Sequence, residues 1–312
     1  MRPDSDSPLP SGERAGERSE VGRGEVRGGR ETHCPSPRGG EGVRAALGTA
    51  TAALAGTSQT PRLDAELLMA HALGITREKL LLSHLDSDTP ASFAPLVTRR
   101  LAHEPIAYIT GTRAFWTIEL LVGPGALVPR ADSETLIEAA VEHFGDDLAP
   151  LRILDLGTGP GTLLLAALDQ WPEAHGLGVD ASGQALGYAQ TNAEALGVTD
   201  RAIFRAGNWA EGLKGEFDLI LANPPYIATD DDLPAEVRDH EPAGALFAGP
   251  DGLDDYRVIA PQLRALLAPG GAAILEIGMS QAEAVSALLE AQGFAVALRH
   301  DLAGHPRALV AT

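Results

Sequence analysis

Cysteine is nearly absent from this sequence: Cys34 is the single one among 312 residues. One thiol cannot form an internal disulfide, and the scarcity fits a reducing compartment. The nine histidines form no His-Glu-x-x-His motif and no cluster with cysteine, so we expect no metal site. No apolar stretch approaches the roughly 20 residues of a membrane span, and the amino terminus lacks the apolar core of a signal peptide. We therefore expect a cytoplasmic protein that does not bind membranes.

Positive charge is also scarce, since 24 lysines and arginines face 43 acidic residues and the net charge is −19. A protein that grips duplex nucleic acid needs basic surface to neutralise the phosphates. The acidic balance therefore argues against direct nucleic-acid binding and favours a protein or a small molecule as substrate. Hydrophobic residues make up 44% and charged residues 21%, which is typical of one or two soluble globular domains. We expect a monomer.

Residues 1–42 contain hardly any apolar side chains and are rich in Gly, Arg, Glu, Ser and Pro. Such a segment cannot offset its ordering entropy, so it is predicted to be a disordered extension. Residues 22–30 resemble an arginine- and glycine-rich RNA-binding tail, but acidic residues nearly match the arginines of the segment. Two explanations stay open: a functional arm, or an unused start codon with true initiation near Val43.

The pattern from 43 to 111 is helical. Thr60-Pro61 suits a helix start, with Thr as the cap and Pro at the first helical position, and Gly74 suits the stop. Further helices are predicted over 77–84 and 92–102. The segment therefore predicts a small helical bundle, whose role is either structural support or recognition of a partner.

Residues 112–130 change to strand character. The apolar run 115–122 predicts a strand, and Gly123-Pro124-Gly125 predicts the turn after it. We expect a β-hairpin linker that ends at Val128-Pro129-Arg130.

From 131 to 312 strands and helices alternate, which is typical of a doubly wound α/β domain. Strands are predicted at 151–156, 175–180, 202–206, 217–222, 271–277, 293–299 and 306–311. Helices are predicted at 132–144, 161–170, 182–196, 256–267 and 280–291. The last two strands are too close for a helical crossover, so they should form an antiparallel hairpin at the sheet edge.

The first of these strands ends in a glycine-rich turn. Its sequence is Gly157-Thr158-Gly159-Pro160-Gly161. Glycines let a backbone approach a ligand closely. The Gly-x-Gly-x-Gly spacing differs from the Gly-x-Gly-x-x-Gly of dinucleotide enzymes, whose third glycine makes room for a pyrophosphate. The shorter form favours a ligand without phosphate, such as the methionine part of S-adenosylmethionine, whose ammonium Asp155 could hold.

Two further positions suit the rest of that cofactor. Asp180 ends the next strand, 19 residues beyond Gly161, where a carboxylate can accept from both ribose hydroxyls. Trp209 follows the third strand and could form a wall for the adenine, while Asn208 could hydrogen bond its edge. Core packing is the alternative role for Trp209.

A short motif, Asn223-Pro224-Pro225-Tyr226, directly follows the buried strand predicted at 217–222. The prolines end the strand and stiffen the turn, at the strand end where open α/β sheets place their chemistry. The Asn side-chain oxygen and the first proline carbonyl then form a rigid pair of acceptors for a planar NH2 group, against which Tyr226 would pack. The motif predicts transfer onto an amide or exocyclic amino nitrogen. The alternative is a turn that only ends a strand.

The glycine turn, Asp180 and the Asn-Pro-Pro-Tyr motif together resemble a class I amino-methyltransferase. Glu-Pro-Ile-Ala-Tyr at 104–108 and Val-Pro-Arg at 128–130 narrow the resemblance to the HemK/PrmC family, the glutamine methyltransferases of peptide chain release factors. Further matching segments are 109–111, 115–116, 131–135, 241–242, 245–246 and 252–253. The resemblance covers about 43–312. It departs at Pro160 and at Asn208, where the family often has an acid.

The resemblance implies a class I S-adenosylmethionine-dependent methyltransferase with a Rossmann-like, seven-stranded mixed sheet (131–312). A helical substrate-recognition domain (43–111) and the hairpin linker (112–130) precede it. The implied substrate is the glutamine of the Gly-Gly-Gln motif in class I release factors, methylated on its side-chain amide nitrogen. A ribosomal-protein glutamine and a nucleic-acid adenine are the alternative substrates. The implied catalytic residues are those of the motif at 223–226, and the implied cofactor residues are Gly157, Thr158, Gly159, Pro160, Gly161, Asp180, Trp209 and Asn223.

Overall fold

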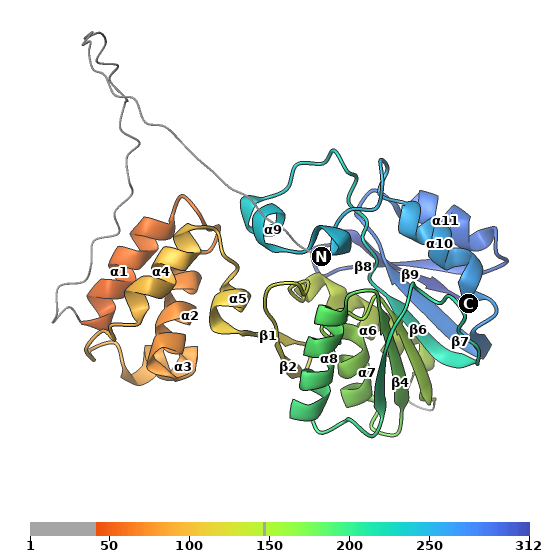
Figure 1. Ribbon diagram of the computed structural model, residues 1–312, viewed down its shortest axis with the longest axis horizontal. Coiled ribbons are helices and arrows are strands. Elements are labelled where there is room, and N and C mark those ends of the chain that lie inside the picture. Colours follow the sequence, from red (N-terminus) through yellow and green to blue (C-terminus); the bar gives the residue numbers. More distant parts are fainter. Residues whose placement is uncertain (1–41, 146–147) are drawn as a thin grey trace, which may run out of the picture. The chain divides into compact units, whose positions relative to one another are not determined.

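A computed structural model describes residues 42–145 and 148–312 (Figure 1). The predicted disordered extension, apart from Gly42, and Cys34 lie outside these residues. No helix within the described ranges is both long and apolar enough to cross a bilayer.

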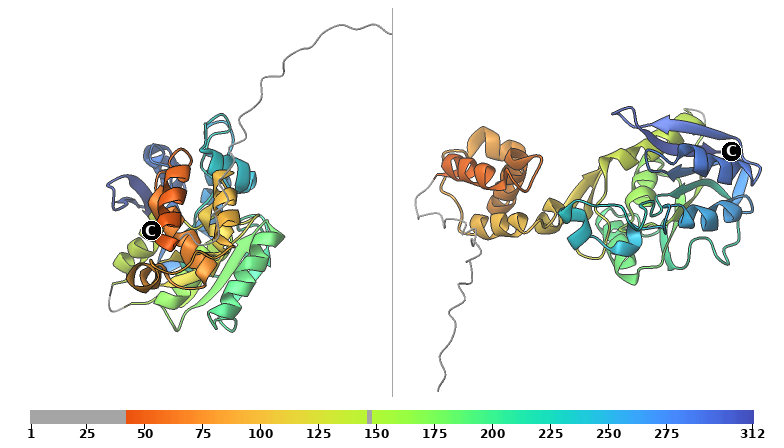
Figure 2. Two further views of the ribbon diagram at one scale, coloured as in Figure 1. Left: turned by 90° about the vertical axis from the view of Figure 1, so that its left-hand side faces the viewer. Right: turned by 90° about the horizontal axis from the view of Figure 1, so that it is seen from above.

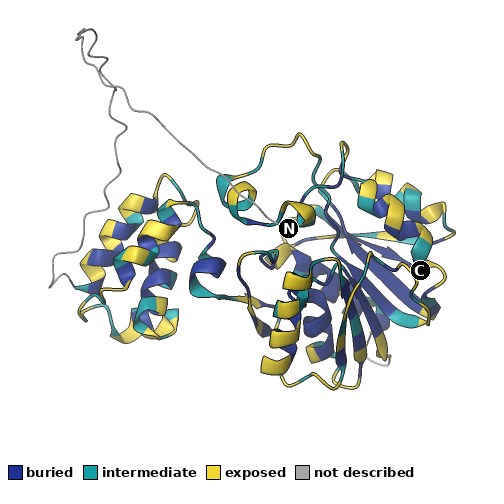
Figure 3. Cartoon of the chain, viewed as in Figure 1, coloured by how far each residue is buried: buried dark blue, intermediate teal, exposed yellow. Residues whose placement is uncertain are grey.

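The first described elements are helical. They are α1 (Val43–Leu54), α2 (Pro61–Leu73), α3 (Arg77–Ser83), α4 (Phe93–Leu101) and α5 (Ile106–Thr110). Their apolar sides face one another, as the dark blue patches of Figure 3 show, and Leu47, Leu68 and Leu80 are fully buried there. Gly74 ends α2 in the left-handed conformation, with φ +64°, and its N–H donates to the His71 carbonyl at 3.0 Å.

The linker contains two short antiparallel strands, β1 (Thr112–Phe115) and β2 (Ile118–Leu121). The prediction of one strand over 115–122 is therefore wrong, because the chain turns at Trp116. The turn predicted at 123–125 is confirmed, since the Ala126 N–H donates to the Gly123 carbonyl at 3.1 Å. Trp116 has a φ of 53°, which side chains rarely adopt. Its N–H donates to Glu134 Oε1 at 2.9 Å and its indole donates to Gln170 Oε1 at 3.3 Å. These tertiary hydrogen bonds compensate for the strained backbone.

The remaining strands form one sheet in the order β5-β4-β3-β6-β7-β9-β8. They are β3 (Arg152–Leu156), β4 (His175–Asp180), β5 (Ala202–Ala206), β6 (Phe217–Ala222), β7 (Leu267–Glu276), β8 (Val296–His300) and β9 (Pro306–Ala311). The first five in the order are parallel, and β9 is antiparallel to both of its neighbours. The predicted seven-stranded mixed sheet with an antiparallel edge hairpin is confirmed.

Helices cover both faces of this sheet (Figure 1 and Figure 2). Helices α6 (Glu134–Phe144), α7 (Thr162–Gln170) and α8 (Gly183–Ala195) pack on one face, and α10 (Asp254–Leu263) and α11 (Ala282–Glu290) pack on the other. Helix α9 (Ala235–His240) has no buried residue and belongs to neither core, and two 3-10 turns are η1 (Ala131–Ser133) and η2 (Ala243–Ala245). Neighbouring strand residues enter opposite cores: Ile153 packs with α6 and α7, whereas Leu154 packs with α10 and α11. This burial on both faces explains why the central strands are predominantly apolar. No prediction covered α9.

The parallel strands place their carboxyl ends along one edge of the sheet. Four segments that are distant in the sequence therefore meet there: the glycine turn after β3, Asp180 at the end of β4, Asn223 after β6 and Glu276 at the end of β7. A functional site at this edge is what an open α/β sheet favours.

Candidate active site

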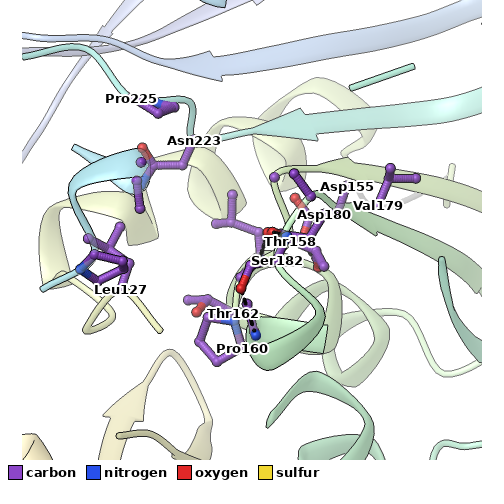
Figure 4. A pocket seen from close by; sticks show the side chains of 18 of the residues that line it. Leu127, Asp155, Thr158, Pro160, Thr162, Val179, Asp180, Ser182, Asn223 and Pro225 are labelled. Atoms are coloured by element: carbon purple, nitrogen blue, oxygen red, sulfur yellow. Dashed lines mark hydrogen bonds between the residues drawn. The ribbon is translucent and has the colours of Figure 1, made fainter. Parts of the chain in front are cut away.

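A pocket of about 480 Å³ opens at this edge of the sheet (Figure 4). Its wall includes Gly157, Thr158, Gly159, Pro160, Asp180, Trp209, Asn223 and Pro225 among the predicted site residues. Gly161, Pro224 and Tyr226 are not part of that wall. Gly161 instead begins α7 with φ +88°, and a Cβ there would lie 2.7 Å from Leu165 Cδ1, so this glycine serves close packing.

The glycine turn is hydrogen bonded to β4 on one side and lies against the Trp209 ring on the other. The Gly157 and Thr158 N–H groups donate to the Val179 carbonyl at 2.8 and 3.0 Å, which ties the turn to β4. Gly157 has φ +73°, and a Cβ at this position would lie 3.0 Å from the Trp209 ring. Glycine is therefore needed where the backbone passes beneath the indole.

Asp155 is a buried carboxylate with one oxygen unsatisfied. Its Oδ2 accepts from Thr158 Oγ1 at 2.6 Å and from the Leu164 N–H at 3.1 Å. Its Oδ1 has no hydrogen-bond partner among the described residues, although the side chain belongs to the pocket wall. Burial raises the pKa of Asp155 to about 7, more than the hydrogen bond from Thr158 lowers it. An ammonium group at the pocket would give the free oxygen its missing partner.

The Asp180 carboxylate is fixed by two backbone donors. Oδ2 accepts from the Gly159 N–H and Oδ1 from the Ser182 N–H, both at 2.8 Å. Each oxygen keeps a second lone pair, so ribose hydroxyls can still bind.

Trp209 also belongs to the wall, and its position is fixed by a residue that the sequence did not suggest. The indole Nε1 donates to Asp255 Oδ1 at 3.1 Å. Burial raises the pKa of Asp255. The backbone of Trp209 has φ 50°, so the side chain is held over the pocket at some conformational cost. Asn208 is exposed and lines the pocket beside it.

The turn at 223–226 is held by Ser133 of η1, Glu276 of β7 and Gln281, which precedes α11. Asn223 Nδ2 donates to Ser133 Oγ at 3.2 Å. The Tyr226 hydroxyl donates to Glu276 Oε1 at 3.4 Å, and Gln281 Nε2 donates to the Tyr226 carbonyl at 2.9 Å. The Asn223 amide is therefore oriented with its nitrogen toward Ser133.

Glu241 connects two segments that line the opposite side of the pocket. Its Oε2 accepts from the Val128 N–H at 3.1 Å, and its Oε1 pairs with Arg130 at 2.5 Å. Arg130 therefore pairs with Glu241 and not with the nearby Asp132, which lies 3.4 Å from Arg307 on β9. The buried Glu241 carboxylate accepts from both the Val128 N–H and the Arg130 guanidinium. It is therefore a better partner for Arg130 than the exposed Asp132.

Sequence reasoning missed four residues that shape this pocket: Ser133, Glu241, Asp255 and Glu276. Glu276 offered a signal, because it ends an apolar strand just as Asp180 does. The other three act through contacts that span between 46 and 113 residues of sequence. Among the described residues, no three His, Cys, Asp or Glu side chains gather in a way that could hold a metal ion.

Two family models match the chain. The PrmC N-terminal domain matches residues 45–111, and the methyltransferase small domain matches residues 133–237. A relative from Rhodospirillum rubrum is 44% identical over 262 residues, covering 81% of this chain and 79% of the relative. A relative from Caulobacter vibrioides is 41% identical over 80% of this chain and 89% of its own length. A relative from Bradyrhizobium diazoefficiens is 42% identical over 88% of this chain and 96% of its own length. All three carry the name release factor glutamine methyltransferase.

The chain belongs to the release factor glutamine methyltransferase family. The predicted HemK/PrmC resemblance is therefore confirmed, and so is the predicted class of methyltransferase enzyme. Membership of the release factor glutamine methyltransferase family also confirms S-adenosylmethionine as the cofactor. The pocket fits this cofactor, because it offers a free buried carboxylate oxygen, a turn in which three of five residues are glycines, and an indole wall.

Proposed function

We propose that this protein transfers a methyl group from S-adenosylmethionine to the side-chain amide nitrogen (N5) of the glutamine in the Gly-Gly-Gln motif of class I peptide chain release factors. The names of its relatives support this substrate. The observation that carries the proposal is the orientation of Asn223. Its amide nitrogen donates to Ser133 Oγ at 3.2 Å, which leaves Oδ1 as an acceptor at the wall of the pocket.

The chemical difficulty lies in the nucleophile. An amide nitrogen is a poor nucleophile because its lone pair is delocalised into the carbonyl. Asn223 Oδ1 and the Pro224 carbonyl accept the two N–H bonds of the substrate amide, aim its nitrogen into the pocket and stabilise the positive charge that develops on it. Orientation of this kind lowers a barrier by roughly 7–11 kcal/mol. The released proton passes to water.

The prolines and the tyrosine of the motif keep these acceptors in place. Pro225 fixes the backbone of the turn, so the Pro224 carbonyl cannot rotate away. Burial raises the pKa of Tyr226, so its hydroxyl stays protonated and donates to Glu276. Tyr226 therefore anchors the end of the turn.

The other half of the pocket holds the cofactor, which supplies an electrophilic methyl group on a sulfonium. When the cofactor is bound, Asp155 Oδ1 would accept from its ammonium, and the Asp180 carboxylate would accept from its ribose hydroxyls. Trp209 would pack against the adenine, and Gly157, Thr158, Gly159 and Pro160 would hold the methionine part.

The helical domain at 43–111 recognises the release factor outside its Gly-Gly-Gln loop. The hairpin linker at 112–130 joins this domain to the methyltransferase domain at 131–312, which performs the transfer. The protein acts as a monomer in the cytoplasm and does not bind nucleic acid directly, in keeping with its net charge of −19.

The substitution Asn223→Ala tests the carrying observation. Loss of a preorganised polar group at the reacting centre should lower kcat by about 100-fold or more. Cofactor affinity, measured by calorimetric titration, should stay within about threefold of wild type, because the groups assigned to the cofactor ammonium and ribose are untouched. If this variant binds the cofactor and still methylates a release factor at nearly the wild-type rate, Asn223 does not orient the substrate amide.

A further inference from the structure

Two walls of the pocket come from distant parts of the chain. One is the glycine turn, where Pro160 lines the pocket, and the other is the end of the hairpin linker, where Gly125 and residues 127–130 line it. Leu127 and Pro160 mark these two walls in Figure 4. A ligand that binds between two walls binds more tightly when the walls are already fixed relative to each other, because no further ordering is needed. A residue that joins the two walls would therefore contribute to cofactor affinity.

Asn192 hydrogen bonds to the backbone of both the linker and the glycine turn. It lies on α8, is 1% exposed and is not itself part of the pocket wall. Its Nδ2 donates to the Pro160 carbonyl at 2.9 Å and to the Leu121 carbonyl at 3.0 Å. Its Oδ1 accepts from the Leu121 N–H at 2.7 Å. One side-chain amide therefore ties the last residue of β2 to the glycine turn.

These hydrogen bonds require an amide at position 192. The Leu121 N–H can only donate, so it takes Oδ1, and Nδ2 is left for the two carbonyls. An ionised aspartate has the same shape but only accepts, so one of its oxygens would face both carbonyls without a hydrogen between them. Alanine would leave all three backbone groups without this partner. The residue type at 192 therefore decides whether the two walls are joined.

Two further residues of α8 hold the same stretch of linker. Gln184, Tyr188 and Asn192 are four residues apart, so they lie on one face of the helix. Gln184 Nε2 donates to the Pro124 carbonyl at 2.5 Å. A Cβ at Gly123 would collide with the Tyr188 hydroxyl, so glycine lets the linker lie directly against the helix. The end of the linker is thus fastened along α8 before it lines the pocket.

We infer that Asn192 is a positioning residue for S-adenosylmethionine, because it holds the linker wall against the glycine turn and so keeps the space for the methionine part formed in advance. The inference rests on the part of the proposed function that places the methionine part at the glycine turn. Asn192 touches neither the cofactor nor the reacting atoms. Its loss therefore falls on cofactor affinity, and kcat at saturating cofactor changes little.

Calorimetric titration with S-adenosylmethionine at pH 8, without release factor, tests the inference in three variants. Asn192→Ala and Asn192→Asp should each raise the Kd of the cofactor by about tenfold or more, because the hydrogen bonds to both walls are lost. Gln184→Ala removes one exposed hydrogen bond to the same stretch of linker and should raise Kd by about two- to fivefold. At saturating cofactor, kcat and the KM for release factor should stay within about threefold of wild type.

Gln170→Ala is the matched control. The Gln170 amide also holds the hairpin linker, since its Oε1 accepts from the Trp116 indole at 3.3 Å, but neither of these residues is part of the pocket wall. This variant should lower the melting temperature of the protein without cofactor and leave Kd within about twofold of wild type. The control separates a loss of stability in the linker from a loss of the fixed wall.

The outcomes distinguish this inference from the proposed function. An unchanged Kd in folded Asn192→Ala, or an equal rise of Kd in Gln170→Ala, would overturn the inference. If neither Asn192 variant folds, Gln184→Ala decides: the expected rise of Kd supports the inference, and an unchanged Kd overturns it. Cofactor binding by wild type together with unaffected variants would overturn the inference alone, whereas no cofactor binding by wild type would overturn the proposed function as well.

Discussion

Asp155→Asn is expected to change cofactor binding and stability in opposite directions. Burial raises the pKa of the Asp155 carboxyl from 3.8 to about 7 in the protein without cofactor. The gap between these values corresponds to ~4 kcal/mol that disfavours the ionised carboxylate. Binding of an ammonium at Oδ1 would supply the missing partner and bring the pKa down again.

Asparagine has nearly the same shape, and its oxygen can still accept from Thr158 and Leu164. The sign of the stability change follows from the raised pKa. The contribution of Asp155 to stability is fully present below pH 3.8 and is lost as the pH rises through about 7. At pH 8 the neutral variant should therefore be more stable, by on the order of 1–3 kcal/mol in the free energy of unfolding. Its affinity for S-adenosylmethionine should fall by about 10- to 150-fold, since one charge-assisted hydrogen bond is lost.

Calorimetric titration with S-adenosylmethionine and urea unfolding without cofactor, both at pH 8, measure the two effects. Unchanged affinity, within about twofold, would refute the contact between Asp155 and the ammonium. Weaker binding with reduced stability would show instead that the charge supports the glycine turn, and the reasoning from the free Oδ1 would fail.

Three further outcomes are expected. Gly157→Ala should weaken cofactor binding and reduce stability by about 1–3 kcal/mol, because φ is +73° and the new Cβ would lie 3.0 Å from Trp209; unchanged calorimetry and unfolding would contradict this. Glu276 Oε1 accepts from the Tyr226 hydroxyl at 3.4 Å at the end of the turn that carries Asn223, and burial raises the pKa of Glu276 to about 7. An ionised Glu276 accepts this hydrogen bond better, so kcat should rise with pH through that value and Glu276→Gln should lose this rise; an identical pH profile would argue against a role for the charge. Tyr226, Tyr256, Arg307 and Asp132 are the ionisable groups that face this carboxyl. Deletion of residues 43–111 should impair methylation of a whole release factor far more than that of a short Gly-Gly-Gln peptide, and equal losses would exclude recognition by the helices.

The sheet could be predicted because each strand carries its own local signal. Continuous apolar runs such as 217–222, bounded by turn residues, are buried on both sides, and the observed strand has those same bounds. The turn at Trp116 could not be predicted in this way. Its left-handed backbone depends on hydrogen bonds to Glu134 and Gln170, which lie 18 and 54 residues away.

The same limit applies to the site. The glycine turn and the motif at 223–226 are each a continuous stretch of sequence. Their residue types alone therefore indicated a ligand without phosphate, such as S-adenosylmethionine, and transfer onto an amide or exocyclic amino nitrogen. Ser133 meets Asn223, and Glu276 meets Tyr226, only when η1, β7 and the turn after β6 come together at the sheet edge. Glu276 carries one local signal, an acidic residue at the end of an apolar strand, but nothing local shows which side chains it contacts.

The most direct test of the central claim is transfer of labelled methyl from S-adenosylmethionine to a purified, unmethylated class I release factor. A release factor with Gln→Ala in its Gly-Gly-Gln motif is the control, and mass spectrometry locates the label. The account predicts one methyl group on that glutamine and no label on the control. Absence of label from both, with the cofactor still bound, would contradict the claim and direct attention to a ribosomal-protein glutamine or a nucleic-acid adenine as substrate.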